Sequence, residues 1–353
     1  SPFSLFGNEA KTLGIGGSVL VQNIENYTIA RIDGWNTTTE KHTKIRTGTS
    51  GGLTVKAEED VYSFDFAQTG GNSGKFGVAG SFSFATQTSE TLAQIASGAV
   101  INGGLSGETI LPGGFINVLA SSDATHVNFT GAVQMARQVG IGITAGSTMI
   151  DRDTEALIGS RLTEDNTDPG SAGTDIDADD VTIDATNSGR IIGIGVAGAV
   201  VADVPGLSVK DKSGDPPPQI GAGIAGVVSF AGVDDLTRAY INDTGSISAD
   251  GDLAVTATDS TGILSIAGAA AFAKTSKTAV GIAGAFGFND LDMTTEAFIT
   301  GADIDADDAT LTALRTGDIM AIAMGVAVAA TSPKGAAGGA SVAVSGSFSI
   351  NNV

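Results

Sequence analysis

The segment Ile319-Met-Ala-Ile-Ala-Met-Gly-Val-Ala-Val-Ala329 decides the fold class. Large aliphatic side chains at Ile322, Met324 and Val326 alternate with alanine or glycine, so the apolar pattern has a period of two residues. That period is typical of a β-strand with its bulky side chains on one face, whereas a helix needs a period of 3.6. Turn-forming dipeptides such as Asp33-Gly34 and Asp250-Gly251 separate segments of this kind. The sequence therefore predicts an all-β protein.

Four short motifs recur along the chain in a fixed order. They are a Gly/Ala-rich alternating block, an Ala-x-Ile motif, an alternating strand that closes with alanine, and a second Gly/Ala block. The closing alanine stands at positions 57, 120, 185, 257 and 313, so the steps are 63, 65, 72 and 56 residues. We interpret the chain as one elongated unit with repeats at 12–74, 75–138, 139–219, 220–277 and 278–334, a partial copy at 335–353, and loop insertions at 162–174 and 205–219.

A parallel β-helix (β-solenoid) built from about five repeats of 56–72 residues fits this period best. An immunoglobulin-like sandwich needs about 100 residues per module, and a propeller blade takes about 40–50. A solenoid needs only that each coil place its inward residues over those of the coil before it. We expect two or three coils in each repeat. At ~4.8 Å per coil, on the order of 12 coils would then form a rod on the order of 60 Å long.

The small residues of the Gly/Ala blocks indicate that the second face of these strands is covered. A strand face that contacts solvent usually presents threonine, lysine or glutamate, but here the face opposite the bulky side chains is alanine and glycine. Such a face is expected to be covered by a loop, by another layer of the same chain, or by a neighbouring chain.

Composition and charge exclude several functions. The 353 residues include no cysteine, so disulfide frameworks, thiolate metal sites and cysteine nucleophiles are excluded. The 39 acidic residues outnumber the 18 basic ones, which gives a net charge of −21. Such a surface repels phosphate backbones and anionic lipids, so neither nucleic-acid binding nor membrane insertion is expected. The chain starts without a signal peptide and stops within a strand-like pattern, so we expect it to be an excerpt of a longer protein.

One stretch carries a resemblance to known proteins. It is Arg238-Ala-Tyr-Ile-Asn-Asp-Thr-Gly-Ser-Ile-Ser-Ala-Asp-Gly-Asp-Leu-Ala-Val-Thr-Ala-Thr-Asp-Ser-Thr-Gly-Ile-Leu-Ser-Ile-Ala267. This cycle resembles the repeats of giant bacterial surface exoproteins, namely the filamentous-haemagglutinin-like and autotransporter-like adhesins. At the level of repeats the resemblance extends over residues 12–353, and the first two repeats depart from it most. It implies a passenger stalk on a bacterial cell surface or in an extracellular matrix, but it identifies no receptor.

Two identical aspartate-rich hexapeptides are the candidate metal sites. Alternate carboxylates on a strand point the same way, and Ca²⁺ prefers hard oxygen ligands. A solvated turn would also be rich in aspartate, and the glycine framework of calcium-binding nonapeptides is absent. The candidate calcium ligands are Asp175, Asp177, Asp179, Asp303, Asp305 and Asp307.

A polysaccharide lyase or glycosidase acting on glycans is the alternative function, since such enzymes also use β-helices. A glycosidase needs two carboxylates roughly 5–10 Å apart, and a lyase would need clustered basic residues. The basic residues here are scattered, and the only histidines are His42 and His126. We therefore expect no enzymatic activity and no cofactor apart from the candidate calcium.

The interpretation is a non-enzymatic structural or adhesive segment of a large secreted bacterial protein. It would form a stiff rod in a stalk, filament or biofilm matrix, at the cell surface or elsewhere outside the cell. Its expected partners are further repeats or neighbouring copies of the same polypeptide, together with glycans or proteins of a host or matrix surface.

Overall fold

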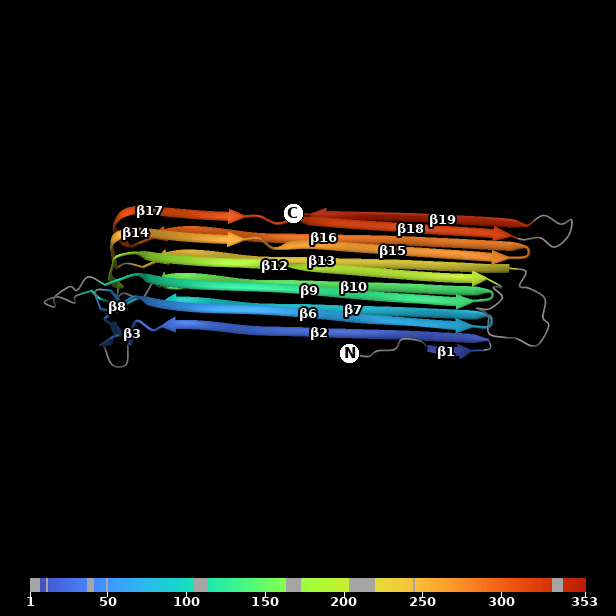
Figure 1. Cartoon of the computed structure of the whole chain (residues 1–353), viewed down its shortest axis with the longest axis horizontal. Helices are drawn as coiled ribbons and strands as arrows, with labels where there is room; N and C mark the ends of the chain where they lie inside the picture. The colour runs from blue at the N-terminus through green and yellow to red at the C-terminus, as the bar shows by residue number, and fades with distance from the viewer. Residues whose placement is uncertain are drawn as a thin grey trace.

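The computed structural model describes residues 7–10, 12–36, 41–48, 50–103, 113–162, 173–202, 220–243, 245–331 and 339–353. These residues form strands and connecting turns, with no helix among them, so the prediction of an all-β protein is confirmed. Long parallel strands lie in two stacked sheets, an arrangement consistent with a parallel β-solenoid (Figure 1).

One sheet contains six parallel strands, paired in the order β19-β16-β13-β10-β7-β2. Their bounds are β2 (Leu13–Ile32), β7 (Phe76–Ile95), β10 (Val139–Gly159), β13 (Ile220–Asn242), β16 (Thr278–Thr300) and β19 (Ala340–Asn352). The second sheet contains eleven strands. Its long strands are β6 (Leu53–Ser73), β9 (Ile116–Ala136), β12 (Val181–Ala202), β14 (Ser246–Asp259), β15 (Gly262–Thr275), β17 (Asp303–Arg315) and β18 (Ile319–Thr331).

Short strands complete the chain. The eleven-stranded sheet also holds β1 (Gly7–Ala10), β5 (Lys44–Ile45), β8 (Val100–Ile101) and β11 (Asp175–Ala178), while β3 (Trp35–Asn36) and β4 (Lys41–His42) form an antiparallel pair. Strands β5, β8, β11 and the start of β14 stack on one another at one end of the molecule. There they form a short third side between the two long sheets.

The register shows that each coil contains one whole repeat. We use "coil" for the run of chain from one strand of the six-stranded sheet to the next. Strand β7 pairs with β2 so that Phe76 lies beside Leu13, and β10 follows with Val139 beside Phe76. The expectation of two or three coils per repeat is therefore wrong. That expectation assumed several short strands in each repeat, whereas one repeat forms strands of about 20 residues and therefore fills a single coil. Six strands stacked at ~4.8 Å span only about 25 Å, whereas all of them except β19 are about 66–76 Å long, so the longest axis runs along the strands (Figure 1).

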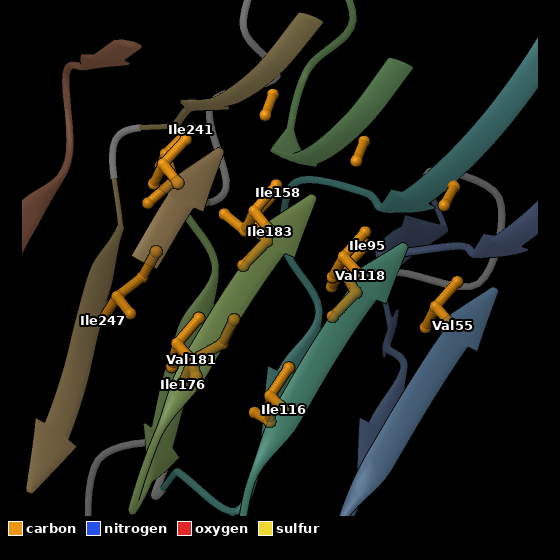
Figure 2. Packing of buried hydrophobic residues seen from close by; sticks show 14 of the residues in the cluster. Val55, Ile95, Ile116, Val118, Ile158, Ile176, Val181, Ile183, Ile241 and Ile247 are labelled. Carbon is orange, nitrogen blue, oxygen red and sulfur yellow. The ribbon is translucent and has the colours of Figure 1, made fainter. Parts of the chain in front are cut away.

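The main apolar core lies at the end where the third side separates the sheets. The Ala-x-Ile motif supplies it from one sheet, since Ile95, Ile158 and Ile241 are fully buried. The alanine-closing strands supply it from the other sheet, through residues such as Val118 and Ile183 (Figure 2). Each burial of an aliphatic side chain of this size stabilises the fold by roughly 1.5–3 kcal/mol.

Away from that end, the two sheets face each other through small side chains. The cluster there consists almost entirely of alanines, among them Ala199, Ala225 and Ala269. At Gly142 the two sheets approach so closely that an added Cβ would lie 2.3 Å from the carbonyl oxygen of Gly198 in the opposite sheet. The small face of the Gly/Ala blocks is thus covered by another layer of the same chain.

The bulky side chains of these blocks point outward. Met324 is 60% exposed and Val326 is 48% exposed on one sheet, and Val344 is 54% exposed on the other. Both outer faces of this half of the molecule are therefore apolar. The two predicted insertions, 162–174 and 205–219, lie for the most part outside the described residues, which include only 162, 173 and 174 of them.

Replacing Ile241 with aspartate is expected to abolish cooperative folding, because an unpaired charge would enter a fully buried site. Ile299, which is only partly buried, should tolerate aspartate better. Thermal unfolding followed by circular dichroism measures both effects. Met324→Asp is the control for an exposed position, and a normal transition for Ile241→Asp would contradict the core assignment.

Two glycines within strands offer a matched test of the sheet contact. Gly142→Ala is expected to lower the free energy of unfolding by about 2 kcal/mol, because its Cβ has no room between the sheets. Gly226 has no atom within 4 Å of the added Cβ, so Gly226→Ala should leave stability unchanged or raise it by about 0.5 kcal/mol. The measurement is the midpoint of urea unfolding for both variants. Equal midpoints would rule out the close approach of the two sheets at Gly142.

Candidate functional site

The six predicted calcium ligands fall on β11, just after it, and on the first residues of β17. Asp175 and Asp177 lie on β11. The residues that follow each of them, Ile176 and Ala178, are buried in the core. Asp303 and Asp305 lie on β17 two coils further on. The alternating carboxylates of each hexapeptide thus share one face, as the sequence indicated.

A serine column separates the two hexapeptides. Asp175 pairs with Ser246, and Ser246 pairs with Asp303. Asp177 and Asp305 are held apart in the same way, by Ser248. Two strand spacings of ~4.8 Å place such carboxylates about 10 Å apart along the stack, which is too far for one cation to bridge them directly.

The remaining two aspartates lie at irregular positions. Asp179 follows β11 and is exposed, and Asp307 lies opposite a register shift between Ala249 and Asp252. Burial raises the pKa of Asp177, and the neighbouring carboxylates of Asp250, Asp175 and Asp179 raise it further. Within the described ranges no group of three or more histidine or acidic side chains is arranged to hold a metal ion. Calcium binding stays a prediction.

A second charged cluster, which the sequence reasoning missed, lies on the outer face of the six-stranded sheet. Arg161, just beyond the end of β10, forms ion pairs with Glu155 and Glu90, and its Nη2 lies 2.8 Å from Oδ2 of Asp153. One guanidinium therefore holds three carboxylates from two adjacent strands, and it ties the chain leaving β10 back onto the sheet.

The same column continues across the next two strands. Glu155 stands in register with Arg238, and Arg238 with Glu296. The Nε of Arg238 donates a hydrogen bond of 2.8 Å to Glu296. The position just before each Ala-x-Ile motif alternates in charge over these coils, so an alignment of the repeats contains the signal for this ladder.

Glu155 is the most perturbed carboxyl group of this cluster. Burial raises its pKa to about 7, and the nearby carboxylate of Asp153 adds to the rise, while Arg161 opposes it. Glu155 and Asp153 stand two residues apart on β10 and share its outer face, so they are a candidate for the pair of carboxylates that a glycosidase requires. However, the Glu155 side chain is only 1% exposed and is neutralised by Arg161. This arrangement fits a structural ion-pair network rather than a site that receives a sugar.

An apolar cap lies beside this network. Leu92, Leu157 and Tyr240 occupy outward positions of the sheet and yet are buried. Leu162 packs against them, and its backbone N–H donates a hydrogen bond of 3.1 Å to the Tyr240 hydroxyl. The residues that follow β10 thus cover this part of the outer face.

A buried ion pair stabilises the space between the sheets. The Nε of Arg152 donates to Asp235 over 2.9 Å and its Nη2 over 2.6 Å, and both side chains are fully buried. Its Nη1 donates to the carbonyl oxygen of Ser188 over 2.7 Å. Burial lowers the pKa of Arg152, but Asp235, helped by Asp259, raises it by more, so the guanidinium stays charged. Removing either partner of such a pair costs about 3–5 kcal/mol.

His126 lies in the same polar layer. Its Nε2 contacts the side-chain oxygen of Gln87, and burial, with a smaller contribution from the charge of Arg152, lowers its pKa to about 4. Glu59, next to it, accepts hydrogen bonds from Asn26, Gln87, Ser89 and Thr91. A neutral, buried histidine in this setting packs and positions its neighbours and has no route to a substrate.

A groove lined by apolar residues lies on the outer face of the six-stranded sheet. It has a volume of about 560 Å³. Gly226, Gly284 and Gly346 form its floor, and an added Cβ at any of them would meet no atom within 4 Å. Ile143, Ile224, Val228, Phe286 and Phe348 are among the residues that line it.

Comparison with models of known protein families, with curated proteins and with solved structures found no match. In the part of the chain that the structure describes, no helix is long and apolar enough to span a membrane.

The pKa of Glu155 predicts a pH dependence of stability. Because the folded state raises this pKa from 4.5 to about 7, it binds the proton more tightly than the unfolded chain does. Stability should therefore fall as the pH rises from about 4.5 to 7. Glu155→Gln is expected to flatten that fall, and Arg161→Gln to steepen it, because the charge that opposes the rise in pKa is lost.

The measurement is the urea midpoint of unfolding across this pH range. Glu58→Gln is the control, since Glu58 is exposed and pairs with Lys56 only at the surface. Parallel pH profiles for wild type, Glu155→Gln and Arg161→Gln would show that the cluster does not titrate with folding.

Proposed function

We propose that the chain is a non-enzymatic structural segment of a large secreted bacterial protein, built as a β-solenoid with one coil per repeat. Stacked coils make a stiff acidic body that spaces or supports other parts of the protein in a stalk, a filament or an extracellular matrix. The resemblance of its repeats to those of filamentous-haemagglutinin-like and autotransporter-like adhesins supports this role and a location at the cell surface.

The observation that carries the proposal is that equivalent positions stack in register through the whole six-stranded sheet. Each coil repeats the inward residues of the coil before it, so Ile95, Ile158 and Ile241 form one buried column. Stacking of equivalent residues on successive coils is what a solenoid requires.

The chemistry of the described residues supports a structural role over a catalytic one. The outward carboxylates of Asp153 and Glu155 are engaged by Arg161. The polar groups between the sheets, such as Arg152 and Glu59, are buried and hydrogen-bonded within the chain. As partners we propose further repeats or neighbouring copies of the polypeptide, and glycans or proteins of a host or matrix surface. The net charge of −21 opposes binding to nucleic acids.

Electron microscopy of the native full-length protein tests this role. The expected particle is a rod whose layers repeat every ~4.8 Å along its axis, with strands of about 66 Å lying across it. The same preparation is incubated with acidic and neutral glycans, and newly formed reducing ends and unsaturated sugars are assayed. Separate globular particles would contradict the solenoid. Glycan turnover that is lost in Glu155→Gln would establish the enzymatic alternative instead.

A further inference from the structure

The apolar outer face of the six-stranded sheet is built from equivalent residues of six coils. We call it the ridge-and-groove face and define it as the outward side chains of 13–21, 76–84, 139–147, 222–230, 280–288 and 342–350, which the strand register places side by side. Its side chains include Ile15, Val19, Phe84 and Phe348, which are 68%, 61%, 45% and 58% exposed.

In two neighbouring columns of this face, every coil places one small side chain beside one larger side chain. Their residue pairs are Gly17 and Val19, Gly80 and Phe82, Ile143 and Ala145, Gly226 and Val228, Gly284 and Phe286, and Gly346 and Phe348. One member of each pair is small and the other is larger. In the third coil the order is reversed, but the contrast is kept. The result is a ridge beside a groove, which is most open over β13, β16 and β19.

On the outer face of the eleven-stranded sheet, the corresponding columns keep this contrast only in the first three coils, for example with Gly131 beside Val133. In the last two coils Gly268 stands beside Ala270, both small, and Met324 beside Val326, both large. Hydrophobicity is thus common to both faces, whereas a size contrast in every coil belongs to the six-stranded sheet.

The size of the face matches a protein–protein interface. Nine residues along the strand and six strands across it cover roughly 700 Å², from the spacings of extended chain. A stable dimer buries about 800 Å² on each partner, and the largest apolar patch of a typical monomer is only about 300–600 Å². The face is therefore large enough to hold a second protein.

The ridge and the groove complement each other in a second copy of the chain. A two-fold axis that runs along the stack between the two columns turns the ridge of one copy onto the groove of the other. Phe286 of one copy then lies over Gly284 of its partner in the same coil, and the facing strands run antiparallel. Such a two-fold contact uses the same surface on both copies, which is the commonest symmetry of homo-oligomers.

Charges at the margins of the face support the same arrangement. The rotation that places Phe286 over Gly284 brings Asp292 of one copy beside Lys277 of the other, and Asp151 beside Arg137. Asp151, Asp234 and Asp292 form an acidic column on one side of the face. Lys75, Arg137 and Lys277 lie on the opposite side, at the turns that lead into the sheet.

We propose that the ridge-and-groove face binds a second copy of this chain by inserting the Phe286 ridge of each copy into the Gly284 groove of the other. The contact deepens the proposed structural role, on which it rests, because it joins neighbouring rods side by side. A second copy fits better than an anionic lipid surface, since the acidic column lies along the same face and would repel it.

The test compares the mass of the chain in solution for variants that change shape while keeping the face apolar. Sedimentation equilibrium is measured for the wild type, for a filled-groove variant, and for a swapped variant that exchanges ridge and groove. The filled-groove variant is Gly226→Phe, Gly284→Phe and Gly346→Phe; the swapped variant is Gly226→Val with Val228→Gly, Gly284→Phe with Phe286→Gly, and Gly346→Phe with Phe348→Gly.

The wild type is expected to dimerise, the filled groove to weaken the dimer on the order of 100-fold, and the swap to restore it to within about tenfold. The added side chains point into open space, so the monomer should keep its fold, which circular dichroism and urea unfolding check. Charge reversal gives a second measurement that does not depend on these variants. Asp292→Lys and Lys277→Asp should each weaken the dimer, and together they should restore it.

Three results would overturn the proposal. A folded wild-type chain that stays monomeric at about 100 µM would remove the interface and leave the structural role standing. A filled groove that associates as strongly as the wild type would show non-specific hydrophobic contact. Tighter binding of the filled-groove variant to phosphatidylcholine vesicles, with no dimer, would assign the face to lipid. Glycan turnover would overturn the structural role and leave a measured dimer intact.

Discussion

Main-chain hydrogen bonding between equivalent residues of successive coils is the interaction on which the rest of the structure depends. It aligns every coil with the next without a gap along the long strands of the six-stranded sheet. Side chains alternate between the two faces of a strand, so a slip of one residue would turn Ala239 and Ile241 outward and place Tyr240 in the core. The repeated Ala-x-Ile motif prevents this slip, because only one register buries all of its isoleucines.

Stacking in register also restricts where charge is tolerated, since equivalent side chains lie ~4.8 Å apart. Where the position is covered, the signs alternate, as in the column of Glu155, Arg238 and Glu296. Where two aspartate hexapeptides share a column, the coil between them carries serine. The column of Asp151, Asp234 and Asp292 is uninterrupted; there partial burial raises the pKa of Asp234, and its two neighbours raise it further. This column of like charges lies at the outer surface, where water screens them.

The sequence predicted the strands and the buried motifs but not the size of a coil. Period-two alternation and the Ala-x-Ile repeat are local signals, and the full burial of Ile158 and Ile241 agrees with them. The number of coils per repeat depends on whether the chain turns within a Gly/Ala block, and glycine is compatible with a turn and with a strand. The Arg161 cluster was not predicted, because Arg161 lies outside the recurring motifs, just before the 162–174 insertion, and pairs with Glu90 from the preceding coil. This contact has no signature in local sequence.

The division of large and small side chains decides where this molecule can interact. With alanine and glycine inside, the two sheets approach until backbone nearly meets backbone, as at Gly142 and Gly198. The space between the sheets is too narrow to hold a ligand. Differences in side-chain size between coils are therefore found on the outer faces. The outer faces carry them as apolar columns of varying size, which water solvates poorly. A protein with this interior is therefore suited to bind through its broad faces, and on the six-stranded sheet every coil pairs a small with a larger side chain in the same two columns.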